Sequence, residues 1–428
     1  MKSISPHYLS RSVIPLFFVL SILSGCSNKK GSEPSEELSN TVVRDSSGHY
    51  HLTEVVTMQL SESHDYHHKF SMSEIVEDIN YIPLETTSDC LLKGGQTSLT
   101  DKYIFTETDG VLFMFTREGK FLRRINTIGQ GPGECDLRDF GIDEQSQLIH
   151  LFDNWSLSIK TYDFNGHFQN EIKNPFLKEP EPNDNSPWAI CCDKKGNIVF
   201  TFSNSSGNMK YKYAVMDKHG EMIYKAPNYD LYDNKNRIYV MSLYPIPLYL
   251  YNNTLHYNYI FNDTVFKVED DYSCQPAYII RTPKKITLET QIKTSTREIA
   301  FSDLSGSFEH HAAREDHRYI YIYSGYRAPY IGLLSRYDKR TGDLMENINP
   351  KIINDWDGGL DIELNPLLQT EDFLVYLQQP FQMKESLTDE HFEKTKVAFP
   401  EKRDSLKSLL NNMQEDDNPV LMIVKLKN

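Results

Sequence analysis

The segment FMFTREGKFL, residues 113–122, consists of an apolar run, a turn that contains Gly119, and a second apolar run. An acid or amide beside glycine between two such runs is typical of a β-hairpin, because the turn needs a residue that tolerates positive φ. The same order of residue types returns around Gly166, Gly220 and Gly342. The sequence therefore predicts an antiparallel hairpin that is repeated along the chain.

The spacing of these turns predicts the number of repeats. The interval from Gly220 to Gly342 is about twice the interval from Gly166 to Gly220, so one further unit is expected inside it, in a weaker copy at residues 248–280. A sixth unit begins near Phe373 and ends with VLMIVKL, the last apolar run. No long amphipathic helix separates the units, which disfavours a parallel βαβ fold. Six units of about four strands each predict an all-β, six-bladed β-propeller of four-stranded antiparallel blades.

Closure of such a ring requires its two ends to meet. The strand-like segment INYIPLE, residues 79–85, precedes the first complete unit, and we predict that it joins the same blade as residues 420–426. The exception to the β pattern is a helical insertion in the last blade, at about residues 384–414. Its expected apolar face, with positions i, i+3, i+4 and i+7 of a helix, consists of Leu406, Leu409, Leu410 and Met413.

The start of the chain resembles a bacterial lipoprotein signal. Basic residues Lys2 and Arg11 precede an apolar run at residues 13–23, and the sequence LSGC, which ends at Cys26, follows directly. In such signals cleavage occurs before the cysteine, whose thiol then carries a diacylglycerol. An uncleaved apolar anchor or an ordinary secretory signal is the alternative interpretation. The lipoprotein interpretation predicts that acyl chains on Cys26 hold the protein on a membrane.

This interpretation divides the chain into three parts. Residues 1–25 are the predicted signal peptide, residues 26–50 a flexible tether, and residues 51–428 the propeller. The net charge of −15 makes nucleic acid an improbable partner, because the chain would repel a phosphate backbone. Five cysteines remain besides Cys26, and an odd number cannot all pair internally. We expect them to be small buried residues, although one disulfide is compatible with the sequence.

A glycine-rich loop, IGQGPGE at residues 128–134, raises the question of phosphate binding. A phosphate loop needs a lysine and a hydroxyl residue after its last glycine, with a helix behind it. Here Glu134 stands in that place, Pro132 removes a backbone donor, and the residues that follow are strand-like. We predict that the loop only connects the last strand of one blade to the first strand of the next.

Several of these segments occur in an order that we recognise. YIPLETT at residues 81–87, the pair Cys90-Leu91, the hairpin around Gly119, the loop IGQGPGE and the pair Asp139-Phe140 resemble the six-bladed β-propeller lipoproteins that are abundant in Bacteroidetes. These proteins are relatives of NHL-repeat propellers. The resemblance implies an exported lipoprotein of the outer membrane that faces the periplasm or the cell surface. It implies no particular activity.

Candidate site residues are few. HDYHH at residues 64–68 offers metal-binding imidazoles, but its place before the first blade favours an exposed connector. In EHHAAREDH, residues 309–317, His310 and His311 are expected on the innermost strand of the fifth blade, where alternation lets only one of them face the channel. Arg138 and Asp139 begin the corresponding strand of the second blade and are candidates for ligand binding, with structural contacts to channel water as the alternative.

Two tryptophans complete the candidate ligand-binding residues. Trp188 and Trp356 lie in loops before predicted strands, and an exposed indole ring can stack on a sugar, although core packing is the simpler interpretation. The sequence contains no GxSxG, HExxH or CxxC motif, and we predict neither a metal nor a cofactor. It favours a binding or scaffold module that engages a glycan, a peptide or an envelope protein. A carbohydrate-active hydrolase or lyase with its site at the channel mouth is the alternative.

Overall fold

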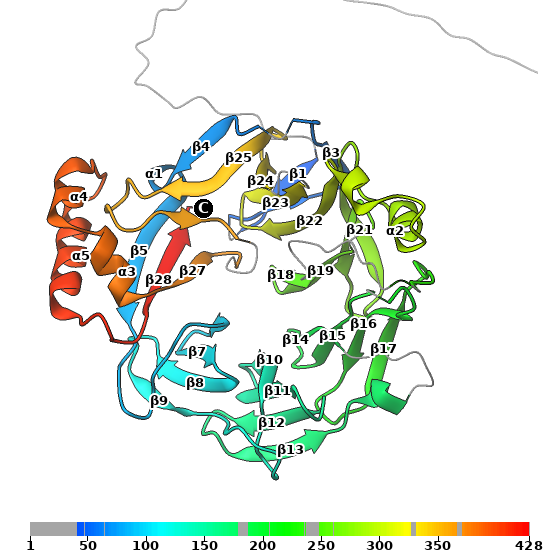
Figure 1. The fold of residues 1–428 in the computed structure, drawn as a ribbon, viewed down its shortest axis with the longest axis horizontal. Coiled ribbons are helices and arrows are strands. Elements are labelled where there is room, and N and C mark those ends of the chain that lie inside the picture. Colours follow the sequence, from blue (N-terminus) through cyan, green and yellow to red (C-terminus); the bar gives the residue numbers. More distant parts are fainter. Residues whose placement is uncertain are drawn as a thin grey trace, which may run out of the picture. The chain divides into compact units, whose positions relative to one another are not determined.

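The computed structural model describes residues 41–46, 48–63, 65–178, 187–204, 206–234, 236, 248–259, 261–326, 331–365 and 370–427. These residues belong to one compact unit, Leu38–Asn428. Figure 1 shows its sheets arranged as blades around a ring. The prediction of a six-bladed β-propeller is therefore confirmed.

The first three blades are four-stranded antiparallel sheets, as predicted. Blade 1 consists of β6 (Thr97–Leu99), β7 (Tyr103–Thr108), β8 (Val111–Thr116) and β9 (Phe121–Arg124). Blade 2 consists of β10 (Leu137–Asp143), β11 (Leu148–Asp153), β12 (Ile159–Asp163) and β13 (Phe168–Ile172), which the short helix η1 (Pro175–Lys178) follows. Blade 3 consists of β14 (Ala189–Cys192), β15 (Ile198–Thr201), β16 (Tyr211–Met216) and β17 (Met222–Pro227).

The next two blades are larger, because strands from the N-terminal side of the propeller add to them in parallel. Blade 4 consists of β18 (Leu248–Tyr251), β19 (Thr254–Asn258), β20 (Thr264–Val268) and β21 (Cys274–Arg281), with β3 (Val56–Gln59) beside β21. Between blades 4 and 5 lie α2 (Leu288–Ser295) and η2 (Phe301–Leu304). Blade 5 consists of β22 (Phe308–Glu315), β23 (Tyr319–Tyr326), β24 (Ile331–Asp338), β25 (Leu344–Ile353) and β26 (Ile362–Glu363), with β4 (His68–Ser71) beside β25.

The sixth blade closes the ring by joining both ends of the propeller. It contains β27 (Phe373–Gln378), β28 (Val420–Leu426) and β5 (Val76–Pro83), which follows the one-turn helix α1 (Met72–Ile75). Strand β28 lies in the middle and pairs antiparallel with both neighbours (Figure 1). The predicted pairing of the first and last segments is confirmed, in a register that places Ile82 opposite Leu421 and Ile79 opposite Val424. This blade has three strands among the described residues, instead of the predicted four.

The hairpin turns that predicted the repeat occupy equivalent places. Gly119, Gly166, Gly220 and Gly342 all have φ between 80° and 91° and lie between the third and fourth strands of their blades. Blade 4 departs from this glycine pattern: its turn places Tyr272 at φ 67°, with the Tyr272 N–H donating to the Glu269 carbonyl at 2.9 Å. A non-glycine residue at this conformation explains why the fourth repeat was weak in the sequence.

The helical insertion lies where it was predicted. It comprises α3 (Pro380–Ser386), α4 (Asp389–Lys394) and α5 (Pro400–Asn412), between β27 and β28. Leu406, Leu410 and Met413 are buried, and Leu409 is partly buried against the same cluster. The insertion packs on the side of the last blade, where its partly buried neighbours include Tyr81.

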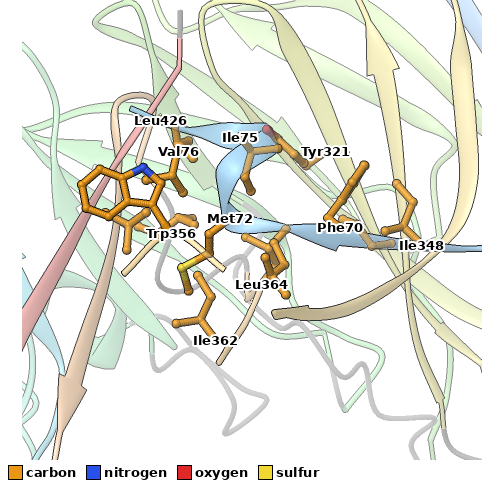
Figure 2. Close-up of a cluster of buried hydrophobic side chains, with 14 of the residues drawn as sticks. Phe70, Met72, Ile75, Val76, Tyr321, Ile348, Trp356, Ile362, Leu364 and Leu426 are labelled. Carbon is orange, nitrogen blue, oxygen red and sulfur yellow. The ribbon is translucent and has the colours of Figure 1, made fainter. Parts of the chain in front are cut away.

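The largest apolar cluster lies between blades 5 and 6 (Figure 2). It combines residues from β4, α1 and β5 with residues of β25 and β28, so the N-terminal strands complete a core that the C-terminal half cannot fill alone. Trp356 is part of this cluster at 2% exposure, and its ring contacts Phe399 at 4.5 Å between centroids. Its burial removes Trp356 from the candidate ligand-binding residues, because a buried ring cannot stack on a ligand.

The predicted tether, residues 26–50, includes residues that are part of the folded structure. A two-stranded hairpin, β1 (Val42–Arg44) and β2 (Tyr50–Leu52), begins within residues 26–50. Strand β2 is held from both sides: the Tyr50 N–H donates to the His317 carbonyl at 2.8 Å, and the Tyr251 hydroxyl donates to the Tyr50 carbonyl at 3.2 Å. The polar composition of this segment concealed the hairpin, because its stability depends on contacts with blades 4 and 5.

The glycine-rich loop connects β9 of blade 1 to β10 of blade 2, as predicted. The Gly131 N–H donates to the Glu134 carboxylate at 2.8 Å. A Cβ added at Gly129 would lie 1.9 Å from the same carboxylate, so the side chain fills the concave side of the loop. A phosphate would have to displace an anion that the chain itself supplies, which rules out the nucleotide interpretation.

Candidate functional site

A cleft of about 460 Å³ lies between the N-terminal hairpin and blade 4. It is lined by residues 50–55 on one side, by the β18–β19 turn and strands β20 and β21 on the other, and by Glu315 at the end of β22. Its size is within the range of sites for small molecules. The cleft is at a blade junction, whereas the alternative interpretation of the sequence, a hydrolase or lyase, placed its site at the mouth of the central channel.

Of the three acidic residues that line the cleft, Glu54, Glu269 and Glu315, the last one is buried, and blades 4 and 5 both help to hold it. The Tyr249 hydroxyl donates to Glu315 Oε1 at 2.7 Å and lies 2.5 Å from the Tyr278 hydroxyl. On the other side of the carboxylate, Lys339 Nζ lies 3.4 Å from Glu315 Oε2. All four side chains are buried, so the carboxylate has fixed partners instead of mobile water.

Lys339 has three further interactions with this region of the propeller. Its ammonium group donates to the Asp316 carbonyl at 2.8 Å and to the Tyr251 hydroxyl at 2.9 Å. It also lies 4.1 Å from the centre of the Tyr251 ring, a cation–π distance. Lys339 therefore connects the turn after β22 to the end of β18, where the floor of the cleft meets the hairpin.

His256 places an imidazole ring beside the same carboxylate. Its Nε2 lies 3.8 Å from Glu315 Oε1, and its ring stacks on Tyr249 with centroids 5.0 Å apart. Burial lowers the pKa of His256 and outweighs the raising effect of Glu315. The imidazole is therefore expected to be neutral at pH 7 and able to accept or donate a proton.

The protonation states of Glu315 and Lys339 depend on two opposing effects, burial and the charge of the partner. Burial alone would raise the pKa of Glu315, but the positive charge of Lys339 is the main effect that lowers this pKa below its usual value. Burial also lowers the pKa of Lys339, which Glu315 partly offsets. We infer an ionised Glu315 paired with a protonated Lys339, because both charges have close hydrogen-bonding partners. The cleft thus offers a fixed negative charge, a neutral imidazole and tyrosine hydroxyls.

A second, smaller cavity of about 170 Å³ lies between blades 3 and 4. Its lining includes Lys194 and Asp270, which form an exposed ion pair at 2.9 Å, and Tyr272 of the atypical turn. Mobile surface pairs of this kind position a ligand poorly. We therefore take the larger cleft as the candidate site.

The predicted residues of blade 2 lie elsewhere. Arg138 is exposed at the start of β10, with its guanidinium 5.4 Å from the centre of the Phe152 ring. Asp139 is buried and accepts hydrogen bonds from the Ile190 N–H at 2.7 Å and from the Phe140 N–H at 2.9 Å. Burial raises the pKa of Asp139 to about 6. Its carboxylate connects blade 2 to blade 3 through backbone N–H groups, so these contacts of Asp139 are structural.

Of the remaining predicted residues, one has a described side chain. Trp188 is 47% exposed just before β14 of blade 3, and its ring remains available as a stacking surface. His310 and His311 lie on β22, the first strand of blade 5 as predicted, but their side chains are outside what the structure describes. Cys26 is likewise outside the described residues.

One segment of blade 5 that was singled out in the sequence contributes to the cleft a residue that was not selected from the sequence. EHHAAREDH drew attention through its adjacent histidines, whereas Glu315 at its end enters the cleft. The signal available for Glu315 was its charge, since a charged residue that becomes buried in a strand needs a partner. Nothing local indicated that this partner would be Lys339 on the loop after β24.

Other features of the described part agree with the expectations. Its cysteines Cys90, Cys135, Cys191, Cys192 and Cys274 are all free and are buried or partly buried. Within the described ranges, no helix is both long enough and apolar enough to cross a membrane.

Comparisons with known proteins concern the family and the fold. A family model described as a domain of unknown function, DUF4934, matches residues 55–425. No curated protein matches the sequence of the chain. A solved structure from Bacteroides fragilis, of a protein described as exported, is 17% identical with a TM-score of 0.63, covering 88% of this chain and 100% of its own. A DUF4221 member from Bacteroides vulgatus is 12% identical with a TM-score of 0.44, covering 82% and 97%. The resemblance to Bacteroidetes propellers is thereby confirmed.

Proposed function

The chain belongs to the DUF4934 family, and from that premise we propose that it is an exported, lipid-anchored propeller that binds a carbohydrate in the cleft between its N-terminal hairpin and blade 4. One observation carries the proposal. The cleft combines tyrosine side chains with a fixed carboxylate and a neutral imidazole at the junction of two blades. The ring of Tyr50, which lines the cleft and is only partly buried, matches the apolar face of a sugar ring, and the polar groups match the sugar hydroxyls.

Export and anchoring rest on the start of the sequence. The signal-like segment that ends in LSGC supports lipidation at Cys26, and the similar fold of the exported Bacteroides fragilis protein agrees with an envelope location. The proposed location is the outer membrane, with the propeller facing the periplasm or the cell surface.

We expect Cys26→Ala to move the protein from the membrane fraction to the soluble fraction, because the variant has no thiol to carry acyl chains. Each buried CH₂ of an acyl chain contributes about 0.8 kcal/mol to membrane binding. The measurement is fractionation of cells followed by detection of the chain, with Cys90→Ala as a control that leaves the signal intact. Equal membrane partition of Cys26→Ala and the unchanged protein would contradict lipidation.

We expect a screen of the soluble chain against a panel of glycans to find a ligand whose affinity Tyr50→Ala weakens by roughly tenfold, which corresponds to about 1.4 kcal/mol. Tyr50 lines the cleft, and its side chain can be removed while the backbone hydrogen bonds that hold β2 remain. Titration calorimetry measures both affinities.

The matched control is Trp188→Ala, which removes an exposed ring from blade 3, outside the cleft. Its affinity should equal that of the unchanged protein. A loss confined to Trp188→Ala would move the glycan site to blade 3, and the absence of any glycan ligand would reject the carbohydrate proposal.

The second candidate is a carbohydrate-active hydrolase or lyase. The observation that favours it is the short distance of 3.8 Å between the His256 imidazole and the Glu315 carboxylate, two groups that can exchange protons with a substrate. Incubation of the bound glycan with the protein distinguishes the two candidates. Release of shorter products that His256→Gln abolishes would support the enzyme, whereas an unchanged glycan supports a binding module.

A further inference from the structure

Three potential metal ligands meet on the N-terminal hairpin, at the rim of the cleft. His49 and His51 are two residues apart at the start of β2, so their side chains leave the strand on the same side. Asp45 follows β1 directly and lies across the turn from them. One ligand atom from each of the three side chains lies within 4.8 Å of the other two.

The distances between these atoms fit a small metal ion. Asp45 Oδ2 lies 2.8 Å from His51 Nε2 and 3.9 Å from His49 Nδ1. Bonds of about 2.0–2.1 Å in a tetrahedral arrangement place neighbouring ligand atoms roughly 3.3 Å apart. One of the two distances from Asp45 is shorter than this spacing and the other is longer. Small side-chain rotations would therefore bring the three ligand atoms to the spacing that a tetrahedral ion needs.

His49 supplies an independent indication of a missing partner. Its Nδ1 is buried, yet it has no hydrogen-bond partner among the described residues. A buried polar atom without a partner is rare and requires an explanation. The ring is also held in place, because it stacks on His317 with centroids 3.8 Å apart, while His317 Nε2 lies 2.7 Å from Asp372 Oδ1. A positioned imidazole with an unused nitrogen is suited to coordinate a cation.

We propose that Asp45, His49 and His51 form a binding site for a divalent transition-metal ion such as Zn²⁺. Two imidazoles and one carboxylate are a donor set that Zn²⁺ accepts, and three protein ligands leave one position open for water or a ligand. His51 also lines the cleft, so the ion would lie at its rim. The proposal does not depend on which ligand the cleft binds, and it opposes the prediction from sequence that no metal is present.

The test uses the exported chain without a histidine tag, stripped with a chelator and dialysed against Zn²⁺. We expect close to one Zn²⁺ per chain by elemental analysis, and we expect addition of Zn²⁺ to raise the melting temperature. His49→Gln/His51→Gln should weaken Zn²⁺ binding by more than about 100-fold, since loss of even an outer partner costs roughly 10–100-fold. Asp45→Asn should also weaken binding, while it keeps an oxygen that can accept from the His49 N–H, a bond of 3.1 Å in the hairpin.

The control is His67→Gln/His68→Gln, which removes two exposed histidines from the competing HDYHH segment. This control should bind Zn²⁺ as the unchanged chain does. Circular dichroism of the metal-free variants separates lost coordination from lost folding. The proposal is overturned if the unchanged chain binds no Zn²⁺, or if binding survives in His49→Gln/His51→Gln and disappears in His67→Gln/His68→Gln.

Discussion

Deletion of the chain from residue 420 onward is expected to abolish cooperative folding of the propeller. The deletion removes β28, the middle strand of the closing blade, whose residues Val420 to Val424 are all buried. Strands β27 and β5 then lose the partner that both of them pair with, and the ring has two open edges. Because a folded protein of this kind is stable by only about 5–15 kcal/mol, loss of a whole core strand should exceed that margin.

Thermal unfolding followed by circular dichroism measures this effect, and the control is a surface change in the same strand. Lys425 forms an exposed ion pair with Glu77 at 2.9 Å, so Lys425→Ala should change stability by no more than about 1 kcal/mol. A single unfolding transition at an unchanged temperature in the deletion variant would show that the ring does not need its closing strand.

Replacement of Glu315 by leucine is expected to destabilise the protein by about 3–5 kcal/mol, because it leaves the ammonium group of Lys339 buried without its ion-pair partner. Lys339 is only 1% exposed at its side chain and cannot reach water in place of the carboxylate. The double variant Glu315→Leu/Lys339→Met should recover much of the loss, since a buried pair can often be replaced by apolar residues of similar size. Denaturant unfolding of the two variants gives both free energies.

The loss of stability in Glu315→Leu should also depend on pH. In Glu315→Leu the pKa of Lys339 falls further, so the folded state binds fewer protons at this site than the unfolded state does. Relative to the unchanged protein, the variant should therefore gain stability as pH rises toward about 10.4, the usual lysine value. Glu390→Leu, which removes an exposed partner of Lys394 in α4, is the control and should cost less than about 1 kcal/mol. If Glu315→Leu and Glu390→Leu lost equal amounts of stability, the interaction of Glu315 with Lys339 would not stabilise the protein more than an exposed ion pair does.

Much of the architecture could be predicted because it depends on local rules. Blades 1 to 5 turn between their third and fourth strands at a residue with positive φ, and in four of them that residue is a glycine: Gly119, Gly166, Gly220 and Gly342. Where the chain uses Tyr272 instead, the repeat was hard to recognise. The helical insertion was visible from the period of its leucines, and ring closure followed from the need to cover the strand edges at both ends.

The candidate sites could not be predicted in the same way, because their members come from different blades. The cleft depends on Glu315 of β22, on His256 of β19 and on Lys339 after β24, and each of them looks ordinary in its own segment. The hairpin around His49 and His51 has too little apolar surface to indicate a fold by itself. The contacts with Tyr251 and His317 that hold it exist only after blades 4 and 5 have formed.

The sequence by itself determined the repeated hairpin, the number of blades, the closing strand and the export signal hypothesis, because each depends on residue types at short and regular spacing. Only the tertiary structure decided which side chains share a site. Alternation along a strand shows that neighbouring residues point to opposite faces, but it does not show which blade meets each face. For that reason Trp356 proved to be core, Asp139 proved to be a link between blades, and Glu315 proved to belong to the cleft.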